Sequence, residues 1–122
     1  MTKLLTIDDE AEFTTIIESY FGMRGFQVFT AGRGDEGLNI FRREKPQVCL
    51  IDLKMPGLHG DEVLREILLE APGTKCIMIT ASEGQSKVRA SLLEMGAYAC
   101  FDKPLSSLKD LENKIKEALE TK

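Results

Sequence analysis

The sequence has no long hydrophobic run. None of its apolar stretches approaches the ~20 residues that a membrane-spanning helix needs. Its first residues, Met1-Thr2-Lys3, lead straight into an apolar segment, without the charged region, longer apolar stretch and small-residue cleavage site of a secretory leader. We therefore expect a cytoplasmic protein that makes no contact with a membrane.

Cysteine is scarce, and its three positions are far apart. Cys49, Cys76 and Cys100 each lie inside an apolar, strand-like run, and they lack the close paired spacing of zinc ligands. An odd number of cysteines inside a core is typical of reduced thiols that pack as small hydrophobic residues. The cysteines therefore predict reduced core thiols rather than a metal site.

Positive charge is not in excess. The chain has 16 Lys and Arg against 20 Asp and Glu, a net charge of −4, whereas binding to nucleic acid needs a basic face. We expect no direct contact with nucleic acid. The single histidine, His59, lies in the loop between Gly57 and Gly60, where we expect an exposed side chain rather than a ligand or phosphodonor.

The chain does have a regular alternation of short apolar runs with amphipathic stretches. Its 122 residues are the length of a single domain, which we place at 1–122. The apolar runs predict strands at Lys3–Ile7, Gln27–Ala31, Val48–Asp52, Lys75–Thr80 and Ala97–Phe101. Apolar residues three and four positions apart predict helices at 10–22, 34–44, 60–71, 84–95 and from about Ser106–Ser107 onward.

This alternation predicts an α/β fold. Repeated strand–helix units with short connections form a parallel sheet with right-handed crossovers and helices on both faces. The runs Val48–Ile51 and Cys76–Ile79 are apolar at every position, which is typical of buried central strands. We expect a doubly wound three-layer sandwich, (βα)5, around a parallel five-stranded sheet.

Polar residues follow four of the apolar runs. Asp8 and Asp9 come directly after the first run, and Asp52 ends the third. Thr80 ends the fourth run, and Lys103 follows the fifth. In an open parallel sheet the carboxyl ends of the strands line one crevice, and ligands bind there. We therefore expect these five side chains to converge.

The three carboxylates predict a divalent cation site. Ionised groups at the ends of buried strands repel one another, and a hard cation with oxygen ligands, Mg²⁺ or Mn²⁺, offsets this repulsion. An aspartate that caps the following helix would explain Asp8 or Asp9 alone, but neither both of them nor Asp52. The Lys103 ammonium and the Thr80 hydroxyl suit the oxygens of a phosphoryl group.

The motifs around these residues resemble those of the receiver domains of two-component response regulators, over essentially the whole chain. The matching segments are Ile7-Asp8-Asp9-Glu10, Ile51-Asp52-Leu53-Lys54-Met55-Pro56-Gly57 through Gly60, Thr80-Ala81, Gly96-Ala97 and Lys103-Pro104. The resemblance implies a flavodoxin-like sheet of order 2-1-3-4-5. It also implies a phosphorylation-controlled signalling module rather than an enzyme.

The resemblance further implies a role for each site residue. Asp52 would accept a phosphoryl group as an acyl phosphate. Asp9 would bind Mg²⁺ directly, Asp8 mainly through water, and the backbone carbonyl of Lys54 would add a ligand. Thr80 and Lys103 would contact the phosphoryl oxygens.

Partners follow from the same resemblance. A histidine kinase or a histidine phosphotransfer protein would donate the phosphoryl group, docking partly on the exposed fringe of helix 10–22. Phosphorylation would pull on Thr80 and move the loop Ala81–Gly84. The output would pass to a target protein or a tethered output domain, through the surface formed by 84–95, 97–101 and the last helix.

The chain departs from the family at one position that matters for this switch. The residue three before the lysine is usually aromatic and couples to the threonine, but here it is Cys100. We therefore expect signalling to depend on the loop after Thr80 and the helix that follows, with Tyr98 or Phe101 a poor substitute. Lys54 and Ser82 stand at two variable positions that resemble those that tune hydrolysis of the phosphorylated form in the family.

Two other functions fit a similar fold. A Mg²⁺-dependent aspartyl-nucleophile phosphatase would need a second aspartate two residues after the nucleophile, where Lys54 stands. A flavodoxin-like electron carrier would need a phosphate-binding loop after the first strand, where Asp8-Asp9-Glu10 would repel a flavin phosphate. The family resemblance further implies that the Lys103–Pro104 peptide bond is cis.

Overall fold

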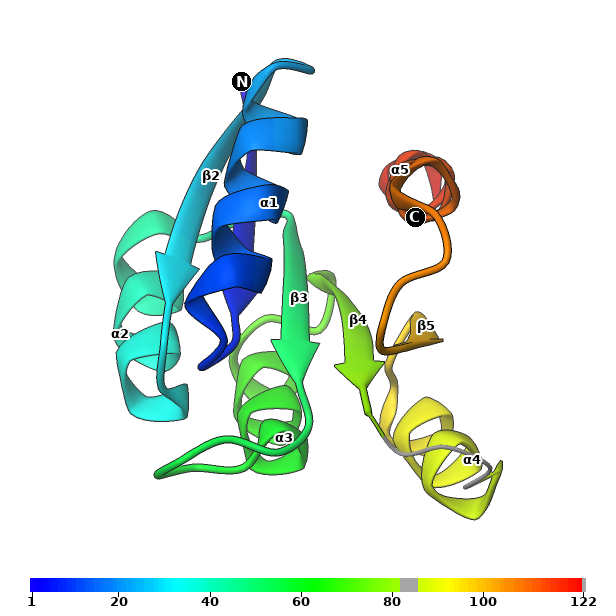
Figure 1. The fold of residues 1–122 in the computed structure, drawn as a ribbon. Coiled ribbons are helices and arrows are strands. Elements are labelled where there is room, and N and C mark those ends of the chain that lie inside the picture. The colour runs from blue at the N-terminus through cyan, green and yellow to red at the C-terminus, as the bar shows by residue number, and fades with distance from the viewer. Residues whose placement is uncertain (82–85, 122) are drawn as a thin grey trace.

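The computed structural model describes residues 1–81 and 86–121, apart from the side chain of Ser86. Its strands are β1 Thr2–Ile7, β2 Phe26–Ala31, β3 Val48–Asp52, β4 Lys75–Thr80 and β5 Ala99–Asp102. Its helices are α1 Ala11–Gly22, α2 Gly34–Glu44, α3 Gly60–Glu70, α4 Ser86–Met95 and α5 Leu108–Glu120. The strands form one parallel sheet in the order β2-β1-β3-β4-β5, which confirms the expected fold (Figure 1).

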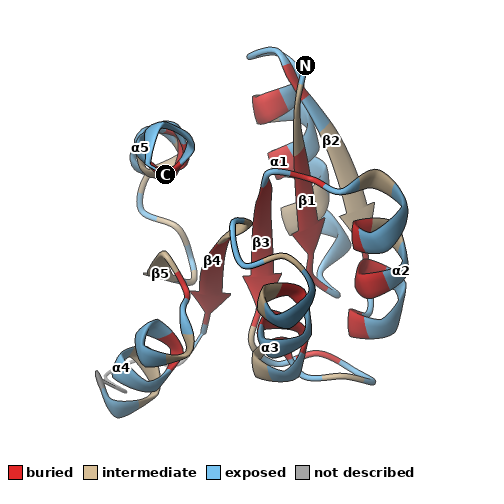
Figure 2. Ribbon diagram, turned by 180° about the vertical axis from the view of Figure 1, so that it is seen from behind, coloured by how far each residue is buried: buried red, intermediate tan, exposed pale blue. Residues whose placement is uncertain are grey.

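The sheet separates two hydrophobic layers. Neighbouring residues of the central strands face opposite layers: Leu50 and Ile77 pack beneath α1 and α5, whereas Ile51 and Met78 pack beneath α2, α3 and α4. Figure 2 shows the central strands buried along their length, with helices exposed on their outer sides. Each fully buried Leu, Ile or Met side chain contributes roughly 1.5–3 kcal/mol, so these two layers hold the strands in place.

The first helix shows how its apolar stripe is divided between core and surface. Ile17 and Phe21 are fully buried against the sheet, Phe13 and Tyr20 are half-buried, and Ile16 is 50% exposed. The stripe therefore supplies core residues along one side and leaves an apolar fringe on the surface.

The ends of some elements differ from the sequence prediction. β5 begins at Ala99 rather than Ala97, because the Ala97 N–H bonds back to the Leu92 carbonyl at 3.1 Å. α1 begins at Ala11, with Glu10 in an extended conformation before it. The first two residues predicted for helix 84–95, and the predicted tuning position Ser82, lie outside the described residues.

The last helix begins as its sequence predicts. The Ser107 Oγ accepts a hydrogen bond from the Asp110 N–H at 3.1 Å, which satisfies one of the free donors at the start of α5. Within the described ranges, no helix is long and apolar enough to cross a membrane.

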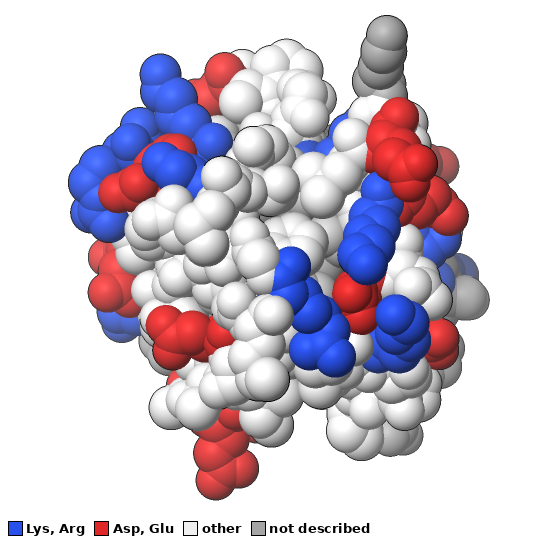
Figure 3. Space-filling model, turned by 90° about the horizontal axis from the view of Figure 1, so that it is seen from above, with Lys and Arg blue, Asp and Glu red and all other residues white. Residues whose placement is uncertain are grey.

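Surface charges of both signs are mixed. On the face seen in Figure 3, groups of Lys and Arg side chains lie beside Asp and Glu side chains around a largely uncharged middle. This pattern agrees with the modest net charge of −4.

Candidate functional site

The carboxyl ends of β1, β3, β4 and β5 lie at one edge of the parallel sheet (Figure 1). The predicted site residues end these strands or follow them closely in the chain. Asp8 and Asp9 follow β1, and Asp52 is the last residue of β3. One carboxylate oxygen from each of the three lies within 4.8 Å of the others. Asp8 and Asp52 are buried and Asp9 is exposed, so the cluster has two fixed carboxylates and one at its opening.

Asp8 serves both the local backbone and the site. Its Oδ1 accepts a hydrogen bond from the Glu10 N–H at 2.9 Å, and its own N–H donates to the Ala31 carbonyl at 2.9 Å. Its Oδ2 is thereby aimed at the site. A role in ordering the start of α1 and a role in the site are therefore both filled by this one residue.

Lys103 bridges the cluster from the opposite end of the chain. Its Nζ lies 2.6 Å from Asp8 Oδ2 and 3.7 Å from Asp52 Oδ2, and its side chain is only 11% exposed. The Lys103 N–H donates to the Thr80 carbonyl at 2.8 Å, which ties it to the end of β4. The Lys103–Pro104 bond is cis, as expected.

A fourth carboxylate, Glu10, joins the site and was not among the predicted site residues. Its Oε1 lies 2.6 Å from Lys103 Nζ, on the exposed side of the lysine. The Phe13 ring lies beneath the same ammonium, 4.8 Å from Nζ to the ring centre. The sequence signal was the third acidic residue of the run Asp8-Asp9-Glu10.

This arrangement shifts the protonation of its members. Burial, with the charges of Asp8 and Asp9 adding to it, raises the pKa of Asp52 to about 7. Burial also raises the pKa of Asp8, although Lys103 opposes this rise. Burial lowers the pKa of Lys103, but its hydrogen bonds to Asp8 and Glu10 outweigh burial and raise it. The site has more carboxylates than positively charged groups, so binding of a cation there is favourable.

The donor set fits Mg²⁺ or Mn²⁺. Carboxylate oxygens are hard ligands, and three of them within reach of one point supply the one or two carboxylates that Mg²⁺ uses in phosphate sites.

The remaining predicted residues lie around this centre. Thr80 is buried at the end of β4, and the exposed Ala81 follows it. Lys54 is exposed, two residues beyond Asp52. Pro104 is exposed directly after Lys103.

Cys100 lies on the side of the sheet that α4 covers. It pairs with Met78 across the β4–β5 ladder and packs half-buried on the layer beneath α4. Tyr98 and Phe101 instead pack against the opposite layer, and the Tyr98 hydroxyl donates to Glu117 of α5. Neither aromatic ring therefore takes the place of the missing one.

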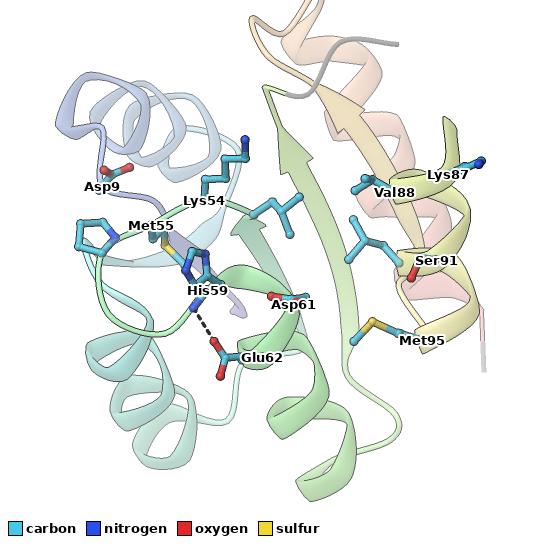
Figure 4. A pocket seen from close by; sticks show the side chains of 13 residues that line it. Asp9, Lys54, Met55, His59, Asp61, Glu62, Lys87, Val88, Ser91 and Met95 are labelled. Atoms are coloured by element: carbon cyan, nitrogen blue, oxygen red, sulfur yellow. Dashed lines mark hydrogen bonds between the residues drawn. The ribbon is translucent and has the colours of Figure 1, made fainter. Parts of the chain in front are cut away.

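Two hollows flank the site. A cleft of about 830 Å³ opens beside Asp9 and Lys54, between the start of α3 and α4, with Val88 and Met95 of α4 projecting toward Met55 (Figure 4). His59 lies on its wall, exposed as predicted, and its backbone N–H donates to Glu62 Oε1 at 3.2 Å.

The second hollow lies on the other side of Lys103. It has a volume of about 560 Å³, and its lining includes Phe13 and Ile16 of α1 and Leu105 and Leu108 near the start of α5.

Comparisons with known proteins agree with this geometry. A family model for the response regulator receiver domain matches residues 4–116. The chain is similar to a crystal structure of a CheY-like response regulator receiver domain protein from Methanospirillum hungatei JF-1, with a TM-score of 0.90 and 30% identity, covering 98% of this chain and 94% of that one.

Two curated relatives differ in how much of their own length this chain covers. A probable transcriptional regulator ycf27 of Porphyridium aerugineum is 40% identical over 117 residues, which cover 96% of this chain and 48% of the relative. Sporulation initiation phosphotransferase F of Bacillus subtilis (strain 168) is 29% identical over 120 residues, covering 98% of this chain and 95% of that protein. This chain thus spans about half the length of the ycf27 relatives.

Proposed function

Because this chain belongs to the response regulator receiver domain family, we propose that it takes up a phosphoryl group on Asp52 from a phosphohistidine donor in a Mg²⁺-dependent reaction. Receiver domains of this family act in two-component signalling through phosphorylation. This membership favours a receiver over the aspartyl phosphatase and the electron carrier that the sequence also allowed.

The position of Asp52 is the observation that carries the proposal. Its carboxylate lies at the end of β3, within 4.8 Å of ligand oxygens of Asp8 and Asp9, and 3.7 Å from Lys103 Nζ. A nucleophile that receives a phosphoryl group needs positive charge on both sides, because charge accumulates on the transferred oxygens. Lys103 supplies one side, and the acidic cluster suits a cation on the other.

Asp8, Asp9 and Asp52 would hold Mg²⁺, with the backbone carbonyl of Lys54 as a further ligand. When bound, Mg²⁺ neutralises charge on the Asp52 carboxylate and on the phosphoryl oxygens. Mn²⁺ prefers the same kind of oxygen ligands and should replace it.

In the transfer step, one Asp52 carboxylate oxygen forms a bond to phosphorus while the N–P bond of the donor histidine breaks. The electron pair of that bond returns to the imidazole nitrogen, so the donor leaves as histidine and Asp52 becomes an acyl phosphate. Lys103 Nζ binds one phosphoryl oxygen, and the Thr80 hydroxyl donates to another.

The acyl phosphate then biases the molecule toward a second conformation. A phosphoryl group brings more negative charge and more acceptor oxygens than the carboxylate it replaces. The Thr80 hydroxyl moves toward it and draws Ala81 along, which shifts α4 by changing the populations of two conformations. Ser82 and Lys54 tune how long the acyl phosphate lasts.

The donor docks over the second hollow. The half-exposed Ile16 and the neighbouring Phe13 and Leu108 offer an apolar surface next to Lys103. A histidine kinase or phosphotransfer protein seated there would present its phosphohistidine to the carboxyl edge of the sheet.

The relatives support two outputs for the surface formed by α4, β5 and α5. A tethered output domain fits the ycf27 relatives, of which this chain matches about half the length. A separate target or a further phosphotransfer partner fits the Bacillus subtilis relative, which this chain matches over 95% of its length. In both, residues 1–122 act as one receiver domain in the cytoplasm, which promotes its own phosphorylation and is not an enzyme toward other substrates.

The test is incubation with acetyl phosphate and Mg²⁺, followed by intact mass measurement. The wild type should gain one phosphoryl group, and the gain should need Mg²⁺ or Mn²⁺ and disappear with EDTA. Asp52→Asn should gain none. Asp110→Asn, which removes an exposed carboxylate from the first turn of α5, is the matched control and should behave as the wild type.

If Asp52→Asn still gains a phosphoryl group, another residue is the acceptor. If neither acetyl phosphate nor a phosphorylated histidine phosphotransfer domain modifies the wild type, the proposed transfer is wrong.

A further inference from the structure

Lys103 has more carboxylate partners than the proposed reaction uses. Its Nζ lies 2.6 Å from Asp8 Oδ2 and also 2.6 Å from Glu10 Oε1. An ammonium carries three N–H donors, and these two carboxylates lie within hydrogen-bond distance of it, whereas Asp52 Oδ2 at 3.7 Å does not. A phosphoryl oxygen on Asp52 therefore competes with Asp8 and Glu10 for the donors and the charge of this ammonium.

The two close partners differ in how easily they can leave. The Asp8 side chain is 1% exposed, and its second oxygen is held by the Glu10 N–H at 2.9 Å. The Glu10 side chain is 63% exposed, and among the described residues its carboxylate has no ion-pair partner besides Lys103. Rotation of Glu10 into solvent thus costs little, whereas removal of Asp8 would leave a buried charge unpaired.

The backbone places Glu10 where such an exchange is feasible. Glu10 is the extended residue before α1, with φ −87° and ψ 104°, so its side chain is not held in a helical turn. Glu10 also lines the second hollow, together with Lys103 and Leu105. That hollow is the side from which we propose the donor approaches.

We propose that Glu10 is a competing carboxylate that occupies Lys103 before phosphorylation and is displaced by the incoming phosphoryl group. Its pairing with Lys103 lowers the affinity of the site for a phosphoryl group, and so sets how readily the domain is phosphorylated. Glu10 is a positioning residue that acts through Lys103. This inference rests on the proposed function, because it needs Lys103 to bind the phosphoryl oxygens.

The test compares three variants by calorimetric titration with beryllofluoride, an analogue of the phosphoryl group, in the presence of Mg²⁺. Glu10→Gln removes the charge. Glu10→Asp keeps the charge but is one methylene shorter, so its carboxylate falls short of Lys103. Glu12→Gln removes an exposed charge from the first turn of α1, and Glu12 forms no ion pair among the described residues.

Both Glu10 variants should bind beryllofluoride about two- to fivefold more tightly than the wild type, the range expected for releasing a partly exposed ion pair. Glu12→Gln should bind as the wild type does. The same order should appear in the rate of phosphorylation by acetyl phosphate. Raising the salt concentration should reduce the difference, because salt screens the Glu10–Lys103 pair.

Three results would overturn the inference. If Glu10→Asp matches the wild type while Glu10→Gln and Glu12→Gln gain equally, only the overall charge near the site matters. If both Glu10 variants bind beryllofluoride as the wild type does, the Glu10–Lys103 pair has no influence on binding of the phosphoryl group. If neither the wild type nor any variant binds beryllofluoride, the proposed function itself fails, and this inference falls with it.

Discussion

Tyr20 of α1 and Glu112 of α5 are joined by a hydrogen bond of 2.8 Å from the phenol Oη to Glu112 Oε1. The Glu112 side chain is only 3% exposed and also pairs with Arg24 Nε at 3.3 Å and Lys116 Nζ at 3.0 Å. The Arg24 guanidinium in turn stacks on the Tyr20 ring at 3.6 Å. One buried carboxylate therefore holds together the two helices on this side of the sheet.

Ionisation of Glu112 should make the free energy of unfolding depend on pH in the acidic range. Hydrogen bonds from Lys116 and Tyr20 lower the pKa of Glu112 to about 2, below its ordinary value of 4.5. Because the folded state holds the proton less tightly than the unfolded state, this contribution is complete above about pH 4.5 and is lost as the pH falls toward 2. Glu112→Gln should therefore be less stable than the wild type at pH 7, and the difference should shrink at pH 3.

Urea unfolding at both pH values measures this difference. Glu120→Gln, a change at an exposed position near the end of the same helix, is the control and should lie close to the wild type at each pH. An equal deficit of Glu112→Gln at pH 7 and pH 3 would show that packing, rather than the ionised carboxylate, joins α1 to α5.

Asp52 should have the opposite effect on stability. Burial raises its pKa to about 7, so the folded state binds the proton more tightly than the unfolded state. Stability without Mg²⁺ should then fall as the pH rises from about 4 to 7, and stay low above that. In the absence of metal, Asp52→Asn should be more stable than the wild type at pH 8 by on the order of 4 kcal/mol, and close to it at pH 4.

Chemical unfolding with EDTA at pH 4 and pH 8 tests this expectation. Addition of Mg²⁺ at pH 8 should stabilise the wild type more than Asp52→Asn, because the variant has lost one of the three carboxylates. A wild type that is the more stable of the two at pH 8 without metal would contradict the prediction.

Gly60 should not tolerate a side chain. A Cβ at this position would lie 2.1 Å from the Asp52 carbonyl oxygen and 2.7 Å from the Leu53 Cα. Because backbone atoms at the end of β3 cannot move aside without displacing Asp52, Gly60→Ala should cost about 1–3 kcal/mol of stability and slow phosphorylation. Thermal unfolding and the acetyl phosphate assay measure the two effects.

Gly73 offers the matched control, since a Cβ there would meet nothing within 4 Å. Gly73→Ala should leave both stability and phosphorylation close to those of the wild type. The argument from close packing fails if the two alanine variants behave alike.

Cys100→Tyr should change the response to phosphorylation. Cys100 packs on the layer beneath α4, and its carbonyl accepts a hydrogen bond from Arg89 of α4 at 2.6 Å, so a larger side chain there would bear on the position of α4. We expect beryllofluoride to produce a different set of amide shifts in α4 in this variant, measured by NMR, with Cys100→Ser as the conservative control. Unchanged shifts and unchanged partner binding would mean that this position does not matter.

The sequence predicted the elements best where burial alone decides them. β3 and β4 have the predicted bounds because their residues are apolar on both faces, which only a central strand requires. β5 was predicted two residues too early, because the apolar character of Ala97 does not reveal that its N–H bonds to Leu92. The sequence also predicted that the carboxylates of Asp8, Asp9 and Asp52 lie close together, since strand ends in a parallel sheet meet at one edge.

By itself, then, the sequence determined the alternation of strands and helices and the meeting of Asp8, Asp9, Asp52 and Lys103 at one edge of the sheet, because both depend on periodicity and on position along the chain. Its motifs, rather than its periodicity, carried the resemblance to the family. The tertiary structure decided which carboxylates Lys103 contacts, and that Glu112 joins α1 to α5. These depend on the direction of long side chains and on which residues from distant parts of the chain become neighbours. Periodicity carries no information on either, because it records only which face of an element is buried.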